Sequence, residues 1–195
     1  SRAGFGLALI LSILIVAGVA ALSAAYVSLT AGLPSINALP LLLDARDGQL
    51  LQPTALYDRT GLTLLYKLEN PGVQRRYLLL DPTQSESFAP QLAQAVITLF
   101  DPGFWQHPGF DSLRLTQNDP ATLAERLVSE LLLENEPAGL RRALRMRLLA
   151  AQVTSQYGRA RVLEWYLNSA SFGHLAYGAE SAAQLYLGKT ASKLN

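Results

Sequence analysis

The side chains best suited to proton transfer or anion binding lie in two segments of this sequence. Residues 100–111 read FDPGFWQHPGFD and offer Asp101 and His107, and a later helical run carries Arg141, Arg142 and Arg145. Carboxylates and imidazoles exchange protons, and guanidinium groups pair with phosphate oxygens. The first segment therefore supplies candidate site residues, and the arginine cluster is a candidate phosphate site.

Each of these residues also has a structural interpretation. Asp101 suits a turn or helix cap better than proton transfer, because the backbone would have to shift to present it. His107 lies among aromatic residues and a proline, which favours a packed structural histidine over a ligand-site residue. The arginine cluster is equally compatible with a surface that faces solvent or lipid headgroups.

Composition excludes several classes of function. The chain has 195 residues, a net charge of +1, two histidines and no cysteine. Its length allows one domain plus an anchor, and its low charge provides no field for nucleic acid. Disulfide and thiol chemistry are excluded, and two histidines argue against a zinc site. We expect no metal, no cofactor and no nucleic-acid partner.

An uncharged stretch at the N-terminus predicts a membrane anchor over residues 1–31. No charged residue occurs between Arg2 and Asp44. The apolar run is long enough to cross a hydrocarbon core of roughly 30 Å, and too long for the ~7–15-residue apolar region of a signal peptide. No Lys or Arg follows until Arg46. This bias predicts a cytoplasmic N-terminus and an extracytoplasmic domain in a single-pass protein, with the lipid bilayer as a partner.

Small residues form a stripe along this predicted span. Ala17, Ala21 and Ala25 recur every four residues, with Gly18 beside them. Such stripes let a second membrane helix approach closely, so the pattern predicts a transmembrane protein partner. The alternative is that alanine is simply common in these helices.

The elements after the anchor must position the candidate residues. We expect a linker over 32–52, a juxtamembrane β element over 53–82 and a helical domain over 83–195. Asp58 to Gly61 is a turn signal, which predicts a hairpin of about 54–57 with 62–67 and a third strand near 76–80. In the helix expected over 140–157, the predicted core stripe is Leu140, Leu144 and Leu148.

Three motifs resemble one known family. These are YLNSASFGHLAYGAESAAQLYLGK at 166–189, PTALYDRTG at 53–61 and the segment at 100–111. They are similar to the peptidoglycan glycosyltransferase domain of class A penicillin-binding proteins, glycosyltransferase family 51. The resemblance implies a mainly α, lysozyme-like α+β fold with a small β-hairpin after one transmembrane helix. It also implies the bacterial cytoplasmic membrane, and a domain that normally continues beyond residues 190–195.

The sequence departs from the family where the family's chemistry lies. Phe100 replaces the Glu taken as general base, and Met146 replaces the second essential Glu. Glu125 and Arg126 stand where the family has a glutamine pair. The stretch from Gly109 to Ala121 is about half the family's length, so the segment thought to cover the donor lipid looks deleted.

These departures leave three hypotheses. The first is a structural or accessory subunit of a larger membrane assembly that has lost polymerase activity. The second is an active enzyme polymerising lipid II with relocated acid/base residues, Asp101 or Glu164, although Glu164 is better interpreted as a structural hydrogen-bonding group. The third is a non-catalytic module that binds a lipid-linked sugar pyrophosphate through Arg141, Arg142 and Arg145.

Overall fold

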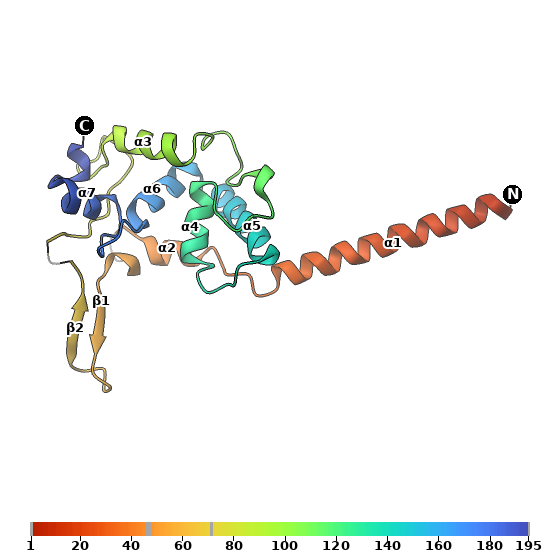
Figure 1. Ribbon diagram of the computed structural model, residues 1–195, viewed down its shortest axis with the longest axis horizontal. Coiled ribbons are helices and arrows are strands. Elements are labelled where there is room, and N and C mark those ends of the chain that lie inside the picture. The colour runs from red at the N-terminus through yellow and green to blue at the C-terminus, as the bar shows by residue number, and fades with distance from the viewer. Residues whose placement is uncertain (1, 46–47, 71, 195) are drawn as a thin grey trace. The chain divides into compact units, whose positions relative to one another are not determined.

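A computed structural model describes residues 2–45, 48–70 and 72–194, in two units, Ser1–Pro34 and Ser35–Asn195 (Figure 1). The first unit is α1 (Arg2–Thr30), whose side chains are exposed from Leu9 to Ser28. Its Leu9–Thr30 portion is long and apolar enough to cross a membrane. The predicted single N-terminal apolar helix is confirmed. The small residues of the stripe, Ala17, Gly18, Ala21 and Ala25, all lie exposed on this helix.

The second unit is mainly helical, with one small sheet, as predicted. Its elements are, in order, α2 (Ala38–Leu43), η1 (Gln49–Leu51), β1 (Thr54–Tyr57), β2 (Leu64–Leu68), α3 (Pro90–Phe100), η2 (Ser112–Arg114), α4 (Leu123–Leu131), α5 (Leu140–Tyr157), α6 (Arg159–Ser169), α7 (Ala179–Leu187) and η3 (Ala191–Lys193). In Figure 1, α4, α5 and α6 lie together, and the hairpin extends away from the helices.

The core lies where α4 and α6 pack on α5. The core face of α5 is formed by Ala143, Met146, Leu149, Ala150 and Val153, all with 0% exposure. The predicted stripe of Leu140, Leu144 and Leu148 is wrong, because Leu140 is 59% exposed and the other two are only half-buried. Small side chains at two core positions allow the neighbouring helices to approach closely, and this turns the bulky leucines toward the rim.

The hairpin matches its predicted turn. β1 and β2 are antiparallel, with Thr54 opposite Leu68 and a bulge between Leu56 and Tyr57. Asp58 Oδ1 accepts hydrogen bonds from the backbone N–H groups of Thr60, Leu62 and Thr63. An aspartate that accepts from the following N–H groups fixes a tight turn without help from the rest of the protein.

The predicted third strand near 76–80 is wrong. The N–H of Leu78 donates to Asn168 Oδ1 at 2.9 Å, and that of Leu80 donates to Glu164 Oε2 at 3.0 Å. Both acceptors belong to α6. A backbone N–H is satisfied equally well by a side chain as by a strand, so this extended segment binds a helix instead of a sheet.

Candidate functional site

The position assigned to the general base is occupied by an aromatic ring covered by a cation. Phe100 is the last residue of α3 and is 44% exposed. The Arg126 guanidinium, from α4, lies 5.4 Å from the centroid of the Phe100 ring. A phenyl ring exchanges no proton, and a guanidinium stays protonated at neutral pH. This pair has no group that could deprotonate a sugar hydroxyl.

The second substituted position faces the core. Met146 has 0% exposure in the middle of α5. Its thioether packs between helices. A charged side chain at this site would be buried, which is costly without a partner. Phe100 and Met146, the two positions predicted to have lost a catalytic acid, thus carry side chains that exchange no proton.

Asp101 is committed to the fold through both carboxylate oxygens. Oδ1 lies 2.8 Å from His107 Nε2, and Oδ2 accepts from the backbone N–H of Leu123 at 3.0 Å. The residue is 4% exposed. It joins the end of α3 to the start of α4, so proton transfer by Asp101 would compete with these structural contacts.

His107 lies in the loop that follows, with both ring nitrogens occupied. Its Nδ1 accepts from the N–H of Gly109 at 3.0 Å, so Nε2 is the nitrogen that donates to Asp101. Because a ring that accepts at one nitrogen and donates at the other is neutral, this histidine fixes the loop in its neutral form. It borders a cavity of about 340 Å³ that Asp101 and Thr122 also line.

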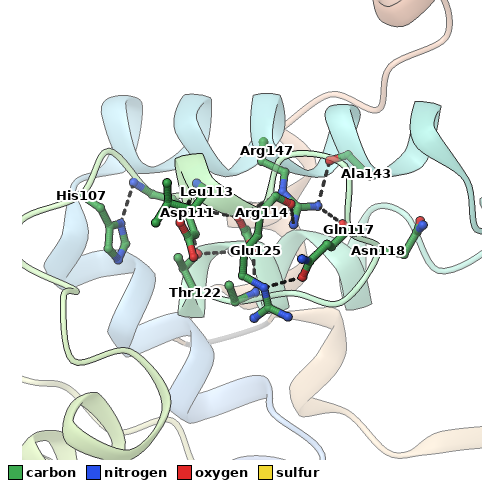
Figure 2. Close-up of polar contacts among 12 residues, drawn as sticks. His107, Asp111, Leu113, Arg114, Gln117, Asn118, Thr122, Glu125, Ala143 and Arg147 are labelled. Carbon is green, nitrogen blue, oxygen red and sulfur yellow. Dashed lines mark hydrogen bonds and ion pairs between the residues drawn. The ribbon is translucent and has the colours of Figure 1, made fainter.

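The segment 109–121 is tied to α4 by a buried carboxylate (Figure 2). Glu125 has 0% exposure, and its two oxygens accept from the N–H groups of Asp111 at 3.1 Å and Ala121 at 2.6 Å. The two ends of the segment are thereby held by one side chain. The sequence analysis noted Glu125 only as a departure from the expected glutamine pair, and it missed this structural role.

An arginine on α5 holds the middle of the same segment. Arg147 is 3% exposed, and its guanidinium donates to the carbonyls of Gln117 and, at 2.8 Å, of Arg114. Its Nε lies 3.4 Å from Glu125 Oε1. Burial lowers the pKa of Arg147, while Glu125 raises it. Figure 2 shows Arg147 close to Glu125 and to Gln117 of the segment.

A glycine allows the segment to begin directly on α5. Gly109 has φ +105°, and a Cβ there would lie 2.3 Å from Thr154 Oγ1 and 2.6 Å from the carbonyl oxygen of Ala150. Thr122 Oγ1 donates to the Gly109 carbonyl and accepts from the N–H of Glu125, capping α4. The segment is therefore a fixed, close-packed strap, in contrast to a mobile cover.

The structure does not gather the three candidate arginines into one site. Arg145 is 5% exposed and pairs with Glu136 at 3.0 Å. Arg142 donates to Ser129 Oγ at 2.7 Å and is half-buried, and Arg141 is exposed. Two of these guanidinium groups thus bridge α5 to α4 and its following loop.

Glu164 has the same structural character. It is 8% exposed, and it accepts from Tyr77 Oη at 2.8 Å, the N–H of Leu80 and Arg161 Nη1 at 2.6 Å. Burial raises the pKa of Tyr77 above its usual range, and the carboxylate adds to that shift. Glu164 thus anchors the segment that precedes α3.

A cavity of about 430 Å³ opens beside α4, which sequence reasoning did not predict. Its lining includes Arg75, Glu130, Ser169, Ser171 and Tyr177. The Arg75 guanidinium lies 4.5 Å from the centroid of the Tyr177 ring. Burial raises the pKa of Glu130, and Arg126 opposes that shift. Among the described residues, no group of three or more His, Cys, Asp or Glu side chains could hold a metal ion.

The helical fold and the placement of the motifs around α3 to α7 define a glycosyltransferase-like scaffold. The model of the transglycosylase family matches residues 72–195, and the chain belongs to that family. The resemblance inferred from the motifs is confirmed.

Penicillin-binding proteins from several bacteria are similar to this chain. Penicillin-binding protein 1A of Vibrio cholerae is 26% identical over 194 residues, covering 93% of this chain and 22% of that protein. Penicillin-binding protein 2D of Bacillus subtilis is 28% identical over 158 residues, 75% of this chain and 22% of its own length. Penicillin-binding protein 1A of Pseudomonas aeruginosa is 29% identical over 185 residues, with coverages of 89% and 21%. The chain spans about a fifth of the length of these curated relatives.

Proposed function

We propose that this chain is a membrane-anchored, extracytoplasmic transglycosylase-like domain that no longer polymerises peptidoglycan. In this proposal it serves as a structural or accessory subunit of a larger membrane assembly. The observation that supports it best is the contact between Phe100 and Arg126 at the position of the family's base. General-base catalysis supplies about 10²–10⁴-fold in rate, so its loss alone would remove useful turnover.

The alternative acids support the same proposal. Asp101 and Glu164 are each less than a tenth exposed and accept structural hydrogen bonds. Glu125, the other buried carboxylate near the strap, is equally committed. Recruiting any of them for proton transfer would break contacts that hold α4 or α6 in place. An active enzyme with relocated acids is therefore the weaker hypothesis.

The N-terminal helix supports the location we propose. α1 supplies one candidate span, and Arg2 precedes it while Arg46 is the next basic residue. This distribution favours a cytoplasmic N-terminus. The similar proteins named above all come from bacteria, so we assign the chain to the bacterial cytoplasmic membrane.

A polymerisation assay tests the loss of activity. The full chain in detergent is incubated with lipid II, with penicillin-binding protein 1A of Pseudomonas aeruginosa run alongside as a reference. We expect glycan strands from the reference only. Strands made by this chain would refute the proposal, and Asp101→Asn and Glu164→Gln variants would then identify the acid.

The accessory role needs its own test. We expect the tagged chain, extracted in mild detergent, to co-purify with a membrane protein. Ala17→Leu and Ala21→Leu, which replace small residues of the stripe with bulky ones, should release that partner, whereas Leu14→Ile on the same helix should not. Purification of the unaltered chain as a lone monomer would count against this role.

Lipid-pyrophosphate binding through the arginines stays an alternative prediction. Arg145 already pairs with Glu136, so only a rearrangement would turn it toward a ligand. Titration of a phospholipid-linked sugar into the chain, compared with the triple variant of Arg141, Arg142 and Arg145 to Ala, distinguishes this activity from a purely structural role.

A further inference from the structure

One guanidinium in the substituted site lacks the hydrogen bonds that its neighbours have. Arg126 is half-buried, and its Nε is fully buried without a hydrogen-bond partner among the described residues. The Arg126 guanidinium lies 5.4 Å from the centroid of the Phe100 ring. Arg147 and Arg159 also have a buried Nε without a hydrogen-bond partner, but their terminal nitrogens donate to backbone carbonyls. The terminal nitrogens of Arg126 donate to no described residue and are not among the buried atoms without a partner, so they can bind an acceptor that approaches from solvent.

Two further groups interact electrostatically with this guanidinium. Tyr166, from α6, is 8% exposed, and burial raises its pKa while Arg126 opposes the shift. Its hydroxyl therefore stays protonated at neutral pH and can donate. Glu130 lies one helical turn beyond Arg126 and interacts with it electrostatically, but no ion pair within 4.0 Å joins these two described residues.

The chemistry of these groups selects one kind of ligand. A guanidinium presents a planar fork of N–H donors that matches a carboxylate with two parallel hydrogen bonds. A dianionic phosphate would be repelled more strongly by the neighbouring carboxylate of Glu130 than a monoanion would. The exposed ring of Phe100 offers an apolar surface for carbon atoms beside the charged group.

We propose that Arg126 binds the carboxylate of a small monoanionic ligand over the ring of Phe100. This rests on the proposed function, because a ligand held here would occupy the substituted site without turnover. Glu130, one helical turn from Arg126, also lines the 430 Å³ cavity, whose edge therefore lies near the proposed site.

The test uses the full chain in detergent micelles with ¹⁵N-labelled arginine. N-acetyl-alanine, a monoanionic carboxylate, is titrated against its uncharged amide and against inorganic phosphate. We expect the acid to shift the Arg126 Nε–H resonance saturably, the amide to leave it unchanged, and phosphate to bind more weakly. No saturable shift, an equal response to the amide, or tighter binding of phosphate would each overturn the proposal.

Variants test whether the ligand binds at Arg126. Because variants of Arg126 lack its Nε–H signal, binding is followed by the resonance of the Glu130 backbone amide. Arg126→Gln should abolish binding, and Arg126→Lys, which keeps the charge but loses the fork, should weaken it roughly ten-fold. Arg159→Gln is the matched control and should bind normally. Retention of binding in Arg126→Gln would contradict the assignment of the site to Arg126. If a variant unfolds, the titrations of acid and amide into the unaltered chain still test whether a carboxylate binds. A negative binding result would not contradict the proposed loss of polymerase activity, because the polymerisation assay tests that loss separately.

Discussion

Glu125 on α4 and Arg147 on α5 form a buried ion pair, with Oε1 and Nε 3.4 Å apart, and both also hold the strap at 109–121. The carboxylate accepts hydrogen bonds from backbone N–H groups near the two ends of the strap, and the guanidinium donates to carbonyls between them. Both oxygens of the carboxylate and both terminal nitrogens of the guanidinium thereby have partners in the strap or on α5. These contacts hold the strap against α4 and α5.

Replacing Glu125 by Gln should destabilise the domain by about 2–4 kcal/mol, because a buried charge loses its partner and an N–H loses its acceptor. Thermal unfolding in detergent measures the effect. The matched control is Glu134→Gln, an exposed carboxylate at the cavity rim, which should change stability by less than about 0.5 kcal/mol. Equal effects of the two substitutions would show that the strap does not depend on this ion pair.

A second prediction concerns the start of the strap. Gly109→Ala should cost about 2–4 kcal/mol, since φ +105° is unfavourable for alanine and its Cβ would meet α5. Adding Thr154→Ala removes the nearer clash but leaves the Ala150 carbonyl at 2.6 Å, so it should not restore stability. Gly139→Ala is the control, because nothing lies within 4 Å of that Cβ. Full restoration of stability by Thr154→Ala would show that only the Thr154 side chain, and not the backbone, excludes a Cβ at residue 109.

Local signals predicted the parts of the fold that local chemistry decides. The hairpin turn follows from Asp58 and Gly61, and the apolar helix α1 follows from an uncharged stretch. The core face of α5 was mispredicted because the spacing of leucines does not show which face of the helix packs against its neighbours. Small residues such as Ala143 and Ala150 determine that face, since they allow another helix to approach closely. The extended segment at 76–80 was mispredicted because its partners, Glu164 and Asn168, are over eighty residues away.

In the candidate site, too, the sequence shows which residues are present but not which contacts they make in the fold. The substitutions at Phe100 and Met146 are visible in the sequence, but their different settings, one beside a cation and one in the core, are not. The pairing of Glu125 with Arg147 also depends on how α4 and α5 pack. A glutamate at a glutamine position and an arginine one residue after Met146 were the only sequence signals for it.

Restoring the missing acid should not restore catalysis. In Phe100→Glu the new carboxylate would lie beside Arg126, which lowers its pKa and makes it a poorer base. We expect no glycan product from this variant, nor from the double variant with Arg126→Gln, because Met146 and the fixed strap are unchanged. The lipid II assay measures both. Glycan strands from Phe100→Glu alone would show that one side chain separates this chain from an enzyme.

The last prediction follows from Glu130, whose pKa burial raises above its usual value, with Arg126 opposing the shift. A carboxyl whose folded pKa lies above its unfolded pKa favours the folded state while protonated. That contribution is fully present below the unfolded pKa, ~4.3, and is lost as pH rises through the folded pKa. Glu130→Gln removes this dependence.

The melting temperatures of wild type and Glu130→Gln should therefore lie closest together near pH 4 and separate by pH 7, with the variant more stable at the higher pH. Glu134→Gln again serves as the control and should follow wild type at both pH values. The reverse order at pH 7, with Glu130→Gln less stable than wild type, would mean that attraction to Arg126 outweighs the burial of the charge. In that case Glu130 would already satisfy the guanidinium, and the ligand site proposed at Arg126 would lose its physical basis.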